Sequence, residues 1–383
     1  MELTNPQNIV IGTDEENKLR EELSKRTDFE SRRMQRYLSM PDLSRADGSP
    51  LKEIVDRAMK VKNLAGFDTI QVPEIVPTNI LFDLFNMPPE HPARSKSDTY
   101  YVNDENVLRT HDTVFWYYYL NHPDIKKRIE NKETLGVACF GKVYRKDEID
   151  RKHMNVFHQF GGLYIAPDDK QTITPEDLKE TLSQVGKAVF GDNVNFRFYD
   201  HNFPYTDPSF EMEAEINGQW IEMVGSGMAR KTVLSNFGLE GYHGWAFGFG
   251  LERLAIASMS LPDIRLLWSD DARVKKQLKL GTKFVEVSKY PPILRDISFI
   301  VESDKFVLND YFDMIREVGG DLIEEVEQLD KYENKEKFGE GRTSYTFRIT
   351  YRSPDRTLEA TEVEPLQAKI YELTASQFNA ETR

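Results

Sequence analysis

Residues 141–165 read GKVYRKDEIDRKHMNVFHQFGGLYI, and this stretch changes character twice. An apolar run ends in Arg145, and seven charged residues crowd residues 145–152. A second apolar run then carries His158 and Gln159 among aromatic residues. Two strands around a charged tip predict an antiparallel hairpin, and such a tip is usually only a solvated surface. The rest of the chain decides whether the polar side chains of this hairpin do chemistry.

The bulk composition is normal for a soluble globular protein. The chain has 383 residues, enough for two domains with separate cores, and 39% of them are hydrophobic. No apolar run is long enough for a membrane-spanning helix. The acidic N-terminus resembles neither a secretory signal nor a transit peptide. A single cysteine, Cys139, excludes an internal disulfide and a cysteine-based metal site. We therefore expect a reducing, cytoplasmic compartment, and a processed organellar protein would look the same.

The net charge of −14 argues against a protein that coats nucleic acid, whose surface would be broadly basic. The charge is compatible with a local basic patch on an acidic body.

Apolar periodicity predicts helices and antiparallel strands up to about residue 285. The expected helices cover 15–40, 50–65, 113–129, 176–190 and about 249–259. The expected strands cover 68–76, 99–102, 135–144, 157–165, 195–201, 210–216 and 219–225. Beyond a Pro pair at 291–292, the predicted order is a strand, a helix, two strands and a helix, which suits a small ferredoxin-like sandwich.

Four side chains suggest a nucleotide site. Arg145 at a strand end is suited to clamp a phosphate, because its planar fork is permanently charged and binds two oxygens. Phe157 on the returning strand offers a flat face to a purine. Arg253 opens a helix after the glycine-bracketed strand WAFGFG, where it can cover the other face of the base. Glu222, just before Gly225, is placed to hold Mg²⁺ on phosphates. The glycine motifs are weak alone, since neither matches a P-loop or Rossmann spacing.

The ordered trio Arg145, Glu222 and Arg253 resembles motifs 2 and 3 of the class II aminoacyl-tRNA synthetases, in detail the phenylalanyl-tRNA synthetases. The segments HPARSKSDTYYV, LRTH, VYRKDEIDRKHMNVFHQ, NFPYTDPS, IEMVGSGM and GWAFGFGLERLAI follow the family's order. The C-terminal KYPPILRDISF and YTFRITYRSPDRTL resemble its ferredoxin-fold anticodon-binding domain. The resemblance covers roughly residues 65–383 and best fits the single-chain, organellar-type form.

This resemblance implies an α+β fold, with a class II antiparallel sheet flanked by helices and a small C-terminal ferredoxin-like sandwich. The implied domains are an N-terminal helical extension (1–65), a catalytic domain (66–285) and an anticodon-binding domain (286–383). The implied activity is ATP-dependent ligation of phenylalanine to its tRNA through a phenylalanyl-adenylate, with Mg²⁺. The implied partners are phenylalanine and tRNA, with no membrane and no second type of subunit, so we expect a monomer.

For the ATP site, the resemblance implies roles for six residues. Arg145 would bind the α-phosphate, Asp147 would lie near the adenine or the incoming tRNA end, and His153 would contact the outer phosphates. Phe157 and Arg253 would sandwich the adenine, and Glu222 would support Mg²⁺. The two arginines are the catalytic candidates, because in-line attack on phosphorus needs positioning and charge neutralisation rather than a covalent intermediate.

For the amino-acid site, the resemblance implies that Phe203 and Tyr205 meet the substrate ring edge to face and that Ala246 is the pocket floor. The groups expected around the substrate's backbone atoms are His111, Thr113, Gln159 and Ser226. An alternative is that the histidine and the glutamine are satisfied core polar groups and that the aromatic residues are plain core.

Two departures from the family pattern fall around the substrate ammonium. After LRTH the family commonly continues Thr-Ser-x-x-Gln, whereas this chain has Asp112 and, four residues later, Trp116. Where the family often has an acid two residues after the glutamine, this chain has Gly161. We expect Gln159, helped by Asp112 or by cation–π contact with Trp116, to bind the ammonium.

Three arginines of the C-terminal domain, Arg342, Arg348 and Arg352, share strand parity and predict a row of guanidinium groups that contacts tRNA phosphates. The alternative is that each pairs with a nearby Asp or Glu.

Two rival functions stay open at this point. One is a paralogue that activates another amino acid on the same fold, and the other is a tRNA-binding protein without ligase activity. Amino-acid-dependent exchange of pyrophosphate into ATP separates them.

Overall fold

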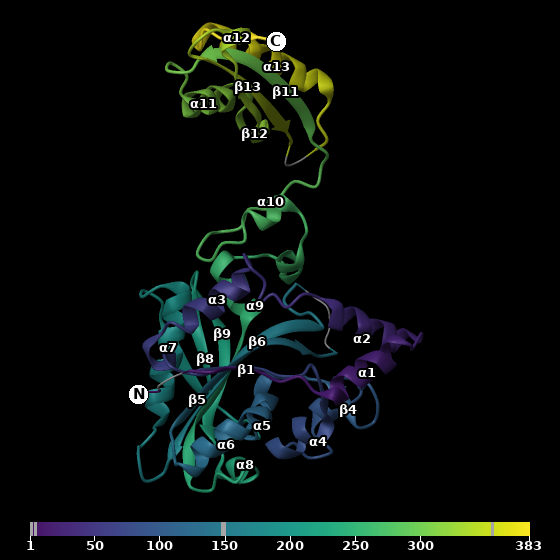
Figure 1. The fold of residues 1–383 in the computed structure, drawn as a ribbon, viewed down its shortest axis with the longest axis vertical. Helices are drawn as coiled ribbons and strands as arrows, with labels where there is room; N and C mark the ends of the chain where they lie inside the picture. Colours follow the sequence, from purple (N-terminus) through teal and green to yellow (C-terminus); the bar gives the residue numbers. More distant parts are fainter. Residues whose placement is uncertain (1–2, 4–5, 147–150, 354–355) are drawn as a thin grey trace. The chain divides into compact units, whose positions relative to one another are not determined.

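The computed structural model describes residues 3, 6–146, 151–353 and 356–383. The chain folds as two compact units, Met1–Phe284 and Val285–Arg383, each with a hydrophobic core of its own (Figure 1). Among the described residues, no helix combines the length and apolar character needed to cross a bilayer.

The N-terminal unit is built on an eight-stranded sheet with the order β1-β2-β5-β6-β10-β9-β8-β7. Its strands are β1 (Asn8–Val10), β2 (Asp68–Gln71), β5 (Leu135–Tyr144), β6 (Val156–Pro167), β7 (Phe196–His201), β8 (Thr206–Ile216), β9 (Gln219–Ala229) and β10 (Tyr242–Gly250). A separate two-stranded ladder pairs β3 (Ile75–Pro77) with β4 (Asn106–Leu108).

The expected α+β class with an antiparallel class II sheet is confirmed, and one edge of the sheet adds parallel pairing. Strand β1 runs parallel to β2, and β2 runs parallel to β5. From β5 to β7 every pairing is antiparallel. The three-residue β1 was not predicted, because so short a segment becomes a strand only through its distant partner.

The helices of this unit are α1 (Asp14–Ser24), α2 (Phe29–Ser39), α3 (Pro50–Ala58), α4 (Thr78–Leu81), α5 (Phe115–Leu120), α6 (Pro123–Glu130), α7 (Pro175–Phe190), α8 (Lys231–Ser235), α9 (Leu251–Met259) and α10 (Ala272–Lys275). The short 3-10 helices are η1 (Lys62–Leu64), η2 (Asp83–Phe85), η3 (Pro92–Arg94), η4 (Asp112–Val114) and η5 (Ile264–Trp268).

Two predicted helices are interrupted. The single helix expected over 15–40 is wrong, because α1 ends at Ser24 and Asp28 starts α2 by accepting a hydrogen bond from the amide of Ser31 at 2.9 Å. The helix expected over 113–129 breaks before Pro123, which has no amide hydrogen to continue α5 and instead opens α6.

The helix expected over 50–65 is also shorter than predicted. Helix α3 ends at Ala58, and a 3-10 turn over Lys62–Leu64 follows.

The strand predicted over 99–102 is wrong. Only Tyr101 forms an isolated bridge, to Val107, and the ladder strand itself is β4. Its partner β3 lies far away in sequence, which local periodicity cannot reveal.

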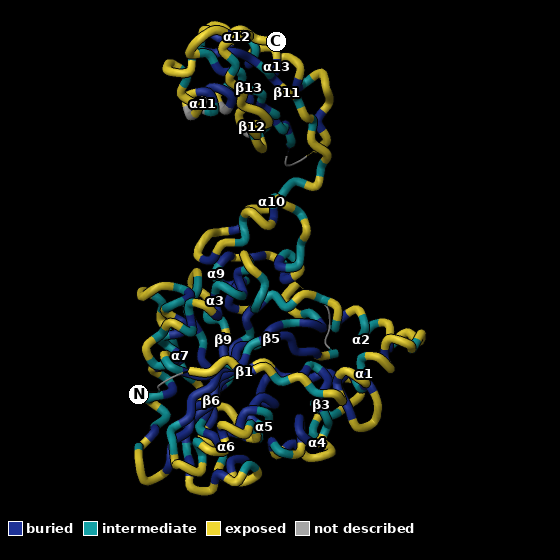
Figure 2. The backbone as a smooth tube through the Cα atoms, in the orientation of Figure 1, coloured by how far each residue is buried: buried dark blue, intermediate teal, exposed yellow. Residues whose placement is uncertain are grey.

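The β5–β6 hairpin lies at the centre of the sheet and is buried along most of its length (Figure 2). Odd-numbered Val137 and Cys139 belong to the same core cluster as Phe115 and Trp116. On the opposite face, Tyr164 of β6 packs against Trp245 of β10 and against Phe67, which directly precedes β2. Covered on both faces, the hairpin is a rigid platform for the side chains at its open end.

The C-terminal unit has the expected ferredoxin-like order. Its elements are β11 (Ile293–Glu302), α11 (Leu308–Gly319), η6 (Gly320–Leu322), β12 (Ile323–Glu333), α12 (Lys335–Phe338), β13 (Arg342–Tyr351), α13 (Ala360–Gln377) and β14 (Glu381–Thr382). The sheet order is β12-β13-β11-β14. Odd-numbered side chains of β11 and β13, such as Phe299 and Phe347, form the core with α11 and α13.

Candidate functional site

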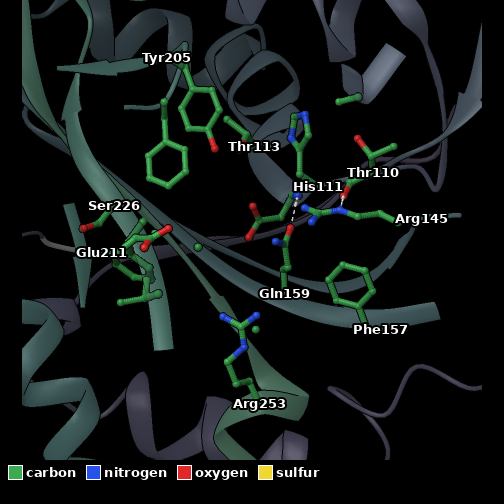
Figure 3. A pocket seen from close by; sticks show the side chains of 18 of the residues that line it. Thr110, His111, Thr113, Arg145, Phe157, Gln159, Tyr205, Glu211, Ser226 and Arg253 are labelled. Atoms are coloured by element: carbon green, nitrogen blue, oxygen red, sulfur yellow. Dashed lines mark hydrogen bonds between the residues drawn. The ribbon is translucent and has the colours of Figure 1, made fainter. Parts of the chain in front are cut away.

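A cavity of about 630 Å³ opens in the N-terminal unit beside β6, β9 and β10 (Figure 3). Every described candidate residue of this unit lines it, namely His111, Thr113, Arg145, His153, Phe157, Gln159, Phe203, Tyr205, Glu222, Ser226, Ala246 and Arg253. Asp147 lies outside the described residues. Residues more than a hundred positions apart therefore meet in one cavity.

Arg145 and Phe157 lie together at one side of this cavity (Figure 3). The Nε of Arg145 donates to the carbonyl oxygen of Thr110 at 2.9 Å. Its guanidinium carbon lies 5.2 Å from the centroid of the Phe157 ring, within the range of a cation–π contact. These two contacts, one polar and one aromatic, orient the arginine toward the cavity.

Arg253 and Glu222 are bonded to each other, which the sequence did not predict. Arg253 Nη1 donates to Glu222 Oε1 from the first turn of α9 to strand β9. Both side chains also line the cavity and are nearly half exposed. The two groups expected to meet the same nucleotide thus neutralise each other's charge.

Glu211 on β8 also lines the cavity, and the sequence reasoning missed it. Its Oε1 lies 3.4 Å from Nδ1 of His201. The alternation EMEAE places Glu211 and Glu213 on one face of β8, and the register shift beside Glu213 inserts the extra residue, Met223, on β9. Glu213 accepts a hydrogen bond from Arg197 and is not among the lining residues.

The rings of Phe203 and Tyr205, expected to bind the amino acid, line another part of the cavity. Their centroids are 5.8 Å apart and their planes differ by only 10°, so they stack in parallel on one another. Phe203 covers Gly225, where a Cβ would lie 2.7 Å from its ring. Burial raises the pKa of Tyr205 to about 12, which keeps its hydroxyl protonated.

His111 is buried, and neither of its ring nitrogens has a hydrogen-bond partner among the described residues. Burial lowers the pKa of His111 to about 3, and the positive charge of Arg145 adds to the effect. The imidazole is therefore neutral, with one nitrogen to donate and one to accept.

The other polar candidates have backbone partners. Gln159 Oε1 accepts from the amide of Asp112 at 2.9 Å, and Ser226 Oγ donates to the carbonyl of Phe210 at 3.2 Å. Thr113 is buried within η4. Ala246 on β10 lies opposite Leu163 and Gly227 in the sheet.

Trp116 was expected as a possible cation–π partner of the ammonium. Its side chain lines the cavity but is only 1% exposed, and it packs edge to face on Phe85 at 5.6 Å. This packing gives Trp116 a structural contact in the core.

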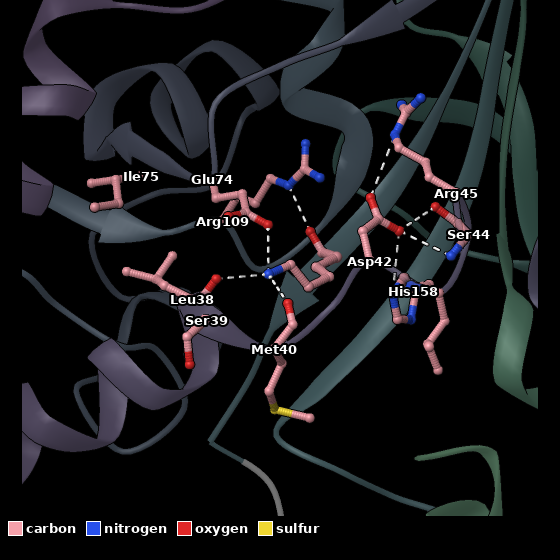
Figure 4. Close-up of polar contacts among 12 residues, drawn as sticks. Leu38, Ser39, Met40, Asp42, Ser44, Arg45, Glu74, Ile75, Arg109 and His158 are labelled. Carbon is pink, nitrogen blue, oxygen red and sulfur yellow. Dashed lines mark hydrogen bonds and ion pairs between the residues drawn. The ribbon is translucent and has the colours of Figure 1, made fainter. Parts of the chain in front are cut away.

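Two buried polar groups hold the hairpin in place (Figure 4). His158 Nδ1 donates to Glu252 Oε1 at 2.6 Å, and Nε2 accepts from the amide of Leu43 at 2.9 Å. Lys142 donates to the carbonyls of Leu38 and Met40 at 3.0 and 2.7 Å. These bonds join residues 38–43, the hairpin and the helix that carries Arg253, so the cavity depends on all three.

In the C-terminal unit the three candidate arginines are ion-paired, as the alternative interpretation expected. Arg348 donates two hydrogen bonds of 2.8 Å to the carboxylate of Asp296. Arg342 donates to Glu381 at 2.9 Å.

Arg352 donates to Glu324 and is the most buried of the three, with 12% of its side chain exposed.

Known proteins match the chain over most of its length. Residues 36–278 match the protein family described as "tRNA synthetases class II core domain (F)". Residues 288–383 match the family described as "Ferredoxin-fold anticodon binding domain".

Three relatives that are similar to the chain over most of its length are named as phenylalanine–tRNA ligases. A phenylalanine–tRNA ligase of Arabidopsis thaliana, named chloroplastic/mitochondrial, is 39% identical over 320 residues, which cover 81% of this chain and 71% of the relative. The mitochondrial enzyme of Mus musculus is 36% identical over 352 residues, covering 82% and 74%. That of Rattus norvegicus is 33% identical over 373 residues, covering 82% and 76%. The chain therefore belongs to the single-chain phenylalanine–tRNA ligases, a family of class II aminoacyl-tRNA synthetases with a ferredoxin-fold anticodon-binding domain.

Proposed function

We propose that this phenylalanine–tRNA ligase forms phenylalanyl-adenylate in the cavity beside β6, β9 and β10, and then transfers the phenylalanyl group to tRNA. The observation that carries the proposal is the gathering of both sets of candidate side chains, for nucleotide and for amino acid, around one cavity of about 630 Å³. A cavity of this size suits two small substrates held side by side.

The class II core uses ATP, and the arginines would bind it. Arg145 would contact the α-phosphate, and its neighbour Phe157 would stack on the adenine. Arg253 would approach the other face of the base once ATP displaces its bond to Glu222. Attack of the amino-acid carboxylate on the α-phosphorus releases pyrophosphate, and a fixed guanidinium stabilises the charge that develops there.

His153 lines the same cavity and would contact the outer phosphates. Asp147, outside the described residues, would act near the adenine or the tRNA end.

The oxygen ligands around the cavity fit Mg²⁺. Among the described residues there is no cluster of three or more His, Cys, Asp or Glu side chains suited to a metal ion. Mg²⁺ on a nucleotide needs only one or two carboxylates, because phosphates and water supply the other ligands. Glu222 would hold the ion, with Glu211 as a second carboxylate. When bound, Mg²⁺ would neutralise phosphate charge.

The aromatic pair would bind the phenyl ring of phenylalanine. Because Phe203 and Tyr205 are parallel, a substrate ring perpendicular to both can meet each of them in the edge-to-face geometry that aromatic rings prefer. Ala246 would limit the depth of the pocket. His111, Thr113, Gln159 and Ser226 would surround the carboxylate and ammonium of the substrate.

We further propose residues 286–383 as the anticodon-binding domain and residues 66–285 as the catalytic domain. The extension over residues 1–65 would support the catalytic domain, since β1 extends the main sheet and residues 38–43 bond to the hairpin. Because both functions lie in one chain, a monomer would be sufficient.

Arg342, Arg348 and Arg352 would contact tRNA phosphates by exchanging carboxylate partners. Exposed ion pairs contribute little stability, about 0–1 kcal/mol, so a phosphate competes with them easily. Arg348 and Arg342, which are more exposed than Arg352, are the better candidates.

The compartment follows from the relatives. The plant and rodent enzymes are named as chloroplastic or mitochondrial, so we propose an organelle in place of the cytoplasm expected from composition.

Amino-acid-dependent exchange of pyrophosphate into ATP, run with each of the twenty standard amino acids, tests the function. Phenylalanine should support the fastest exchange and tRNA charging. Activation of another amino acid tenfold better would favour a paralogue, and tRNA binding without any exchange would favour a non-catalytic protein.

A further inference from the structure

Asp112 lies over a pair of glycines, Gly161 and Gly248, of which Gly248 lines the cavity. Gly161 on β6 and Gly248 on β10 are directly opposite each other in the sheet. A Cβ at Gly161 would lie 2.2 Å from Oδ2 of Asp112, and a Cβ at Gly248 would lie 3.5 Å from Oδ1. The carboxyl group therefore occupies space that any side chain at position 161 would fill.

One of the two carboxyl oxygens of Asp112 lacks the hydrogen-bond partner that its burial demands. Asp112 is 4% exposed and lines the cavity, and its Oδ2 has no hydrogen-bond partner among the described residues. The nearby Arg109 is directed elsewhere, since its Nε donates to the carbonyl of Lys142 at 2.7 Å. Buried carboxylates are normally paired with a cation or with hydrogen-bond donors.

Burial raises the pKa of Asp112 to about 7, and the charges of Arg109 and Arg145 only partly offset this effect. Near neutral pH the group is thus poised between its two forms. A cation that enters the cavity would stabilise the ionised form, and an amino-acid substrate brings such a cation in its ammonium group.

We propose that the carboxylate of Asp112, which fills the space over Gly161 and faces Gly248, binds the α-ammonium of the amino-acid substrate. The inference rests on the proposed function of this cavity and deepens it. Such a site is specific for a primary ammonium next to a carboxylate. The carboxylate that binds this ammonium would belong to the first residue of η4, whereas the family often has an acid at the position of Gly161 on β6. Gln159, whose Oε1 already accepts from the amide of Asp112, positions this residue.

A purely structural role for Asp112 makes different predictions. Asp112 opens η4 at the beginning of the α5 region, where a negative charge favours a helical N-terminus. If Asp112 had only this role, replacing it would change the stability of the protein. The replacement would affect the binding of ligands with and without an ammonium group equally.

The first experiment measures pyrophosphate exchange by the full chain with the isosteric variant Asp112→Asn. The KM for phenylalanine should rise roughly 10- to 100-fold, the loss expected for a charge-assisted hydrogen bond, while the KM for ATP should stay within about threefold. Gln184→Glu, a substitution on α7 away from the lining residues, is the control for a general loss of fold.

Two competitive inhibitors locate the effect on the ammonium group. Phenylalaninol has the ammonium group of phenylalanine but no carboxylate. The second inhibitor, 3-phenylpropanoate, has the carboxylate but no ammonium group. Asp112→Asn should weaken the binding of phenylalaninol by the same factor as the binding of phenylalanine. The inhibition constant of 3-phenylpropanoate should be almost unchanged. Equal weakening of both inhibitors, or no change in either, would overturn the proposal.

The second experiment moves the carboxylate from position 112 to position 161. Gly161→Glu alone should abolish phenylalanine activation, because its Cβ collides with Asp112. In the double variant Asp112→Ser/Gly161→Glu the collision with the carboxyl group is gone, and the ring of Phe115, 3.1 Å from the new Cβ, has to move only slightly. A carboxylate returns, so the KM for phenylalanine should be at least tenfold lower than in Asp112→Ser. Failure of the double variant to recover, with an unchanged melting temperature, would also overturn the proposal.

The pH profile gives an independent readout. The titratable or charged groups that act on Asp112 are Arg109, Arg145, His111, Cys139 and Tyr205. The pKa of His111 is about 3, and those of Cys139 and Tyr205 are about 12, so none of them titrates near neutrality. The KM for phenylalanine should therefore fall as pH rises through about 7 in the unaltered protein and stay flat in Asp112→Asn.

The failures of the two proposals are distinguishable. If another amino acid replaces phenylalanine as the substrate, the proposed specificity fails, and the Asp112 variants are then assayed with that amino acid. If phenylalanine is the substrate but Asp112→Asn leaves its KM unchanged, only the present inference fails.

Discussion

Arg253 on α9 donates a hydrogen bond to Oε1 of Glu222 on β9, so two groups assigned to one nucleotide are partners of each other. Both side chains are nearly half exposed, with 43% and 45% of their surface accessible. A pair so exposed contributes at most about 1 kcal/mol, which phosphate and Mg²⁺ easily exceed. The pair therefore leaves both side chains at the cavity, where the proposed binding of ATP would separate them.

Glu222→Gln should raise the Mg²⁺ concentration needed for half-maximal pyrophosphate exchange by about tenfold, because a neutral amide is a poor ligand for a hard cation. A magnesium titration at saturating ATP measures it. Glu213→Gln is the matched control, since Glu213 lies on neighbouring β8 and pairs with Arg197. An unchanged magnesium requirement in Glu222→Gln would remove Glu222 from the metal site.

Arg145→Ala should slow adenylate formation by about 10²–10³, the effect of removing one preorganised charge contact worth roughly 3–4 kcal/mol. Single-turnover formation of phenylalanyl-adenylate measures it. Arg265→Ala is the control, because Arg265 is exposed and paired with Asp263. Near-normal adenylate formation in a folded Arg145→Ala protein would contradict the assignment of the α-phosphate clamp.

Ala246→Gly should raise the ratio of tyrosine to phenylalanine activation by about tenfold, since the lost methyl group makes room for a para hydroxyl. Exchange rates with the two amino acids measure the ratio. Ala138→Gly is the control for glycine in a buried strand, because Ala138 lies on β5 outside the cavity lining. A similar ratio in both variants would mean that Ala246 is not the floor of the ring pocket.

Asp112→Asn should become progressively more stable than the unaltered protein as pH rises from about 4 to 7. The pKa of Asp112 is about 7 in the folded protein and near 4 in an unfolded chain, so the folded state binds the proton more tightly and loses stability as this proton leaves. The difference should approach about 4 kcal/mol above pH 7.

Urea unfolding of both proteins across this pH range measures that difference. The comparison is needed because the lowered pKa of His111 acts in the opposite direction, adding stability as pH rises from about 3 toward 6.5. A constant difference between the two proteins across the range would show that Asp112 titrates normally.

Arg348→Ala should raise the KM for tRNA in aminoacylation a few-fold and reduce its salt dependence, while pyrophosphate exchange stays unchanged. Asp296→Ala is the matched control, because it removes the carboxylate partner and leaves the guanidinium available. An equal loss in both variants would indicate that the ion pair supports the fold instead of binding tRNA.

Much of the site could be predicted from the sequence because its residues occur in short segments with local signals. The charged tip between two apolar runs predicts the hairpin, and the glycine-bracketed strand before Arg253 predicts the start of α9. The interruption of the predicted helix at Asp28 and the short ladder of β3 and β4 were missed. Their signals depend on a capping side chain or on a distant strand, and apolar periodicity contains neither.

By itself, the sequence determined which side chains are candidates for binding ATP and phenylalanine, and which segments form most of the strands and helices. Only the tertiary structure decided which of these side chains meet. Of two carboxylates on one face of β8, Glu211 lines the cavity and Glu213 pairs with Arg197. The pairing of β6 with β10 brings Gly161 opposite Gly248 beside Asp112. The physical reason is that periodicity follows from local backbone geometry, whereas register and side-chain partners follow from packing between segments far apart in the chain.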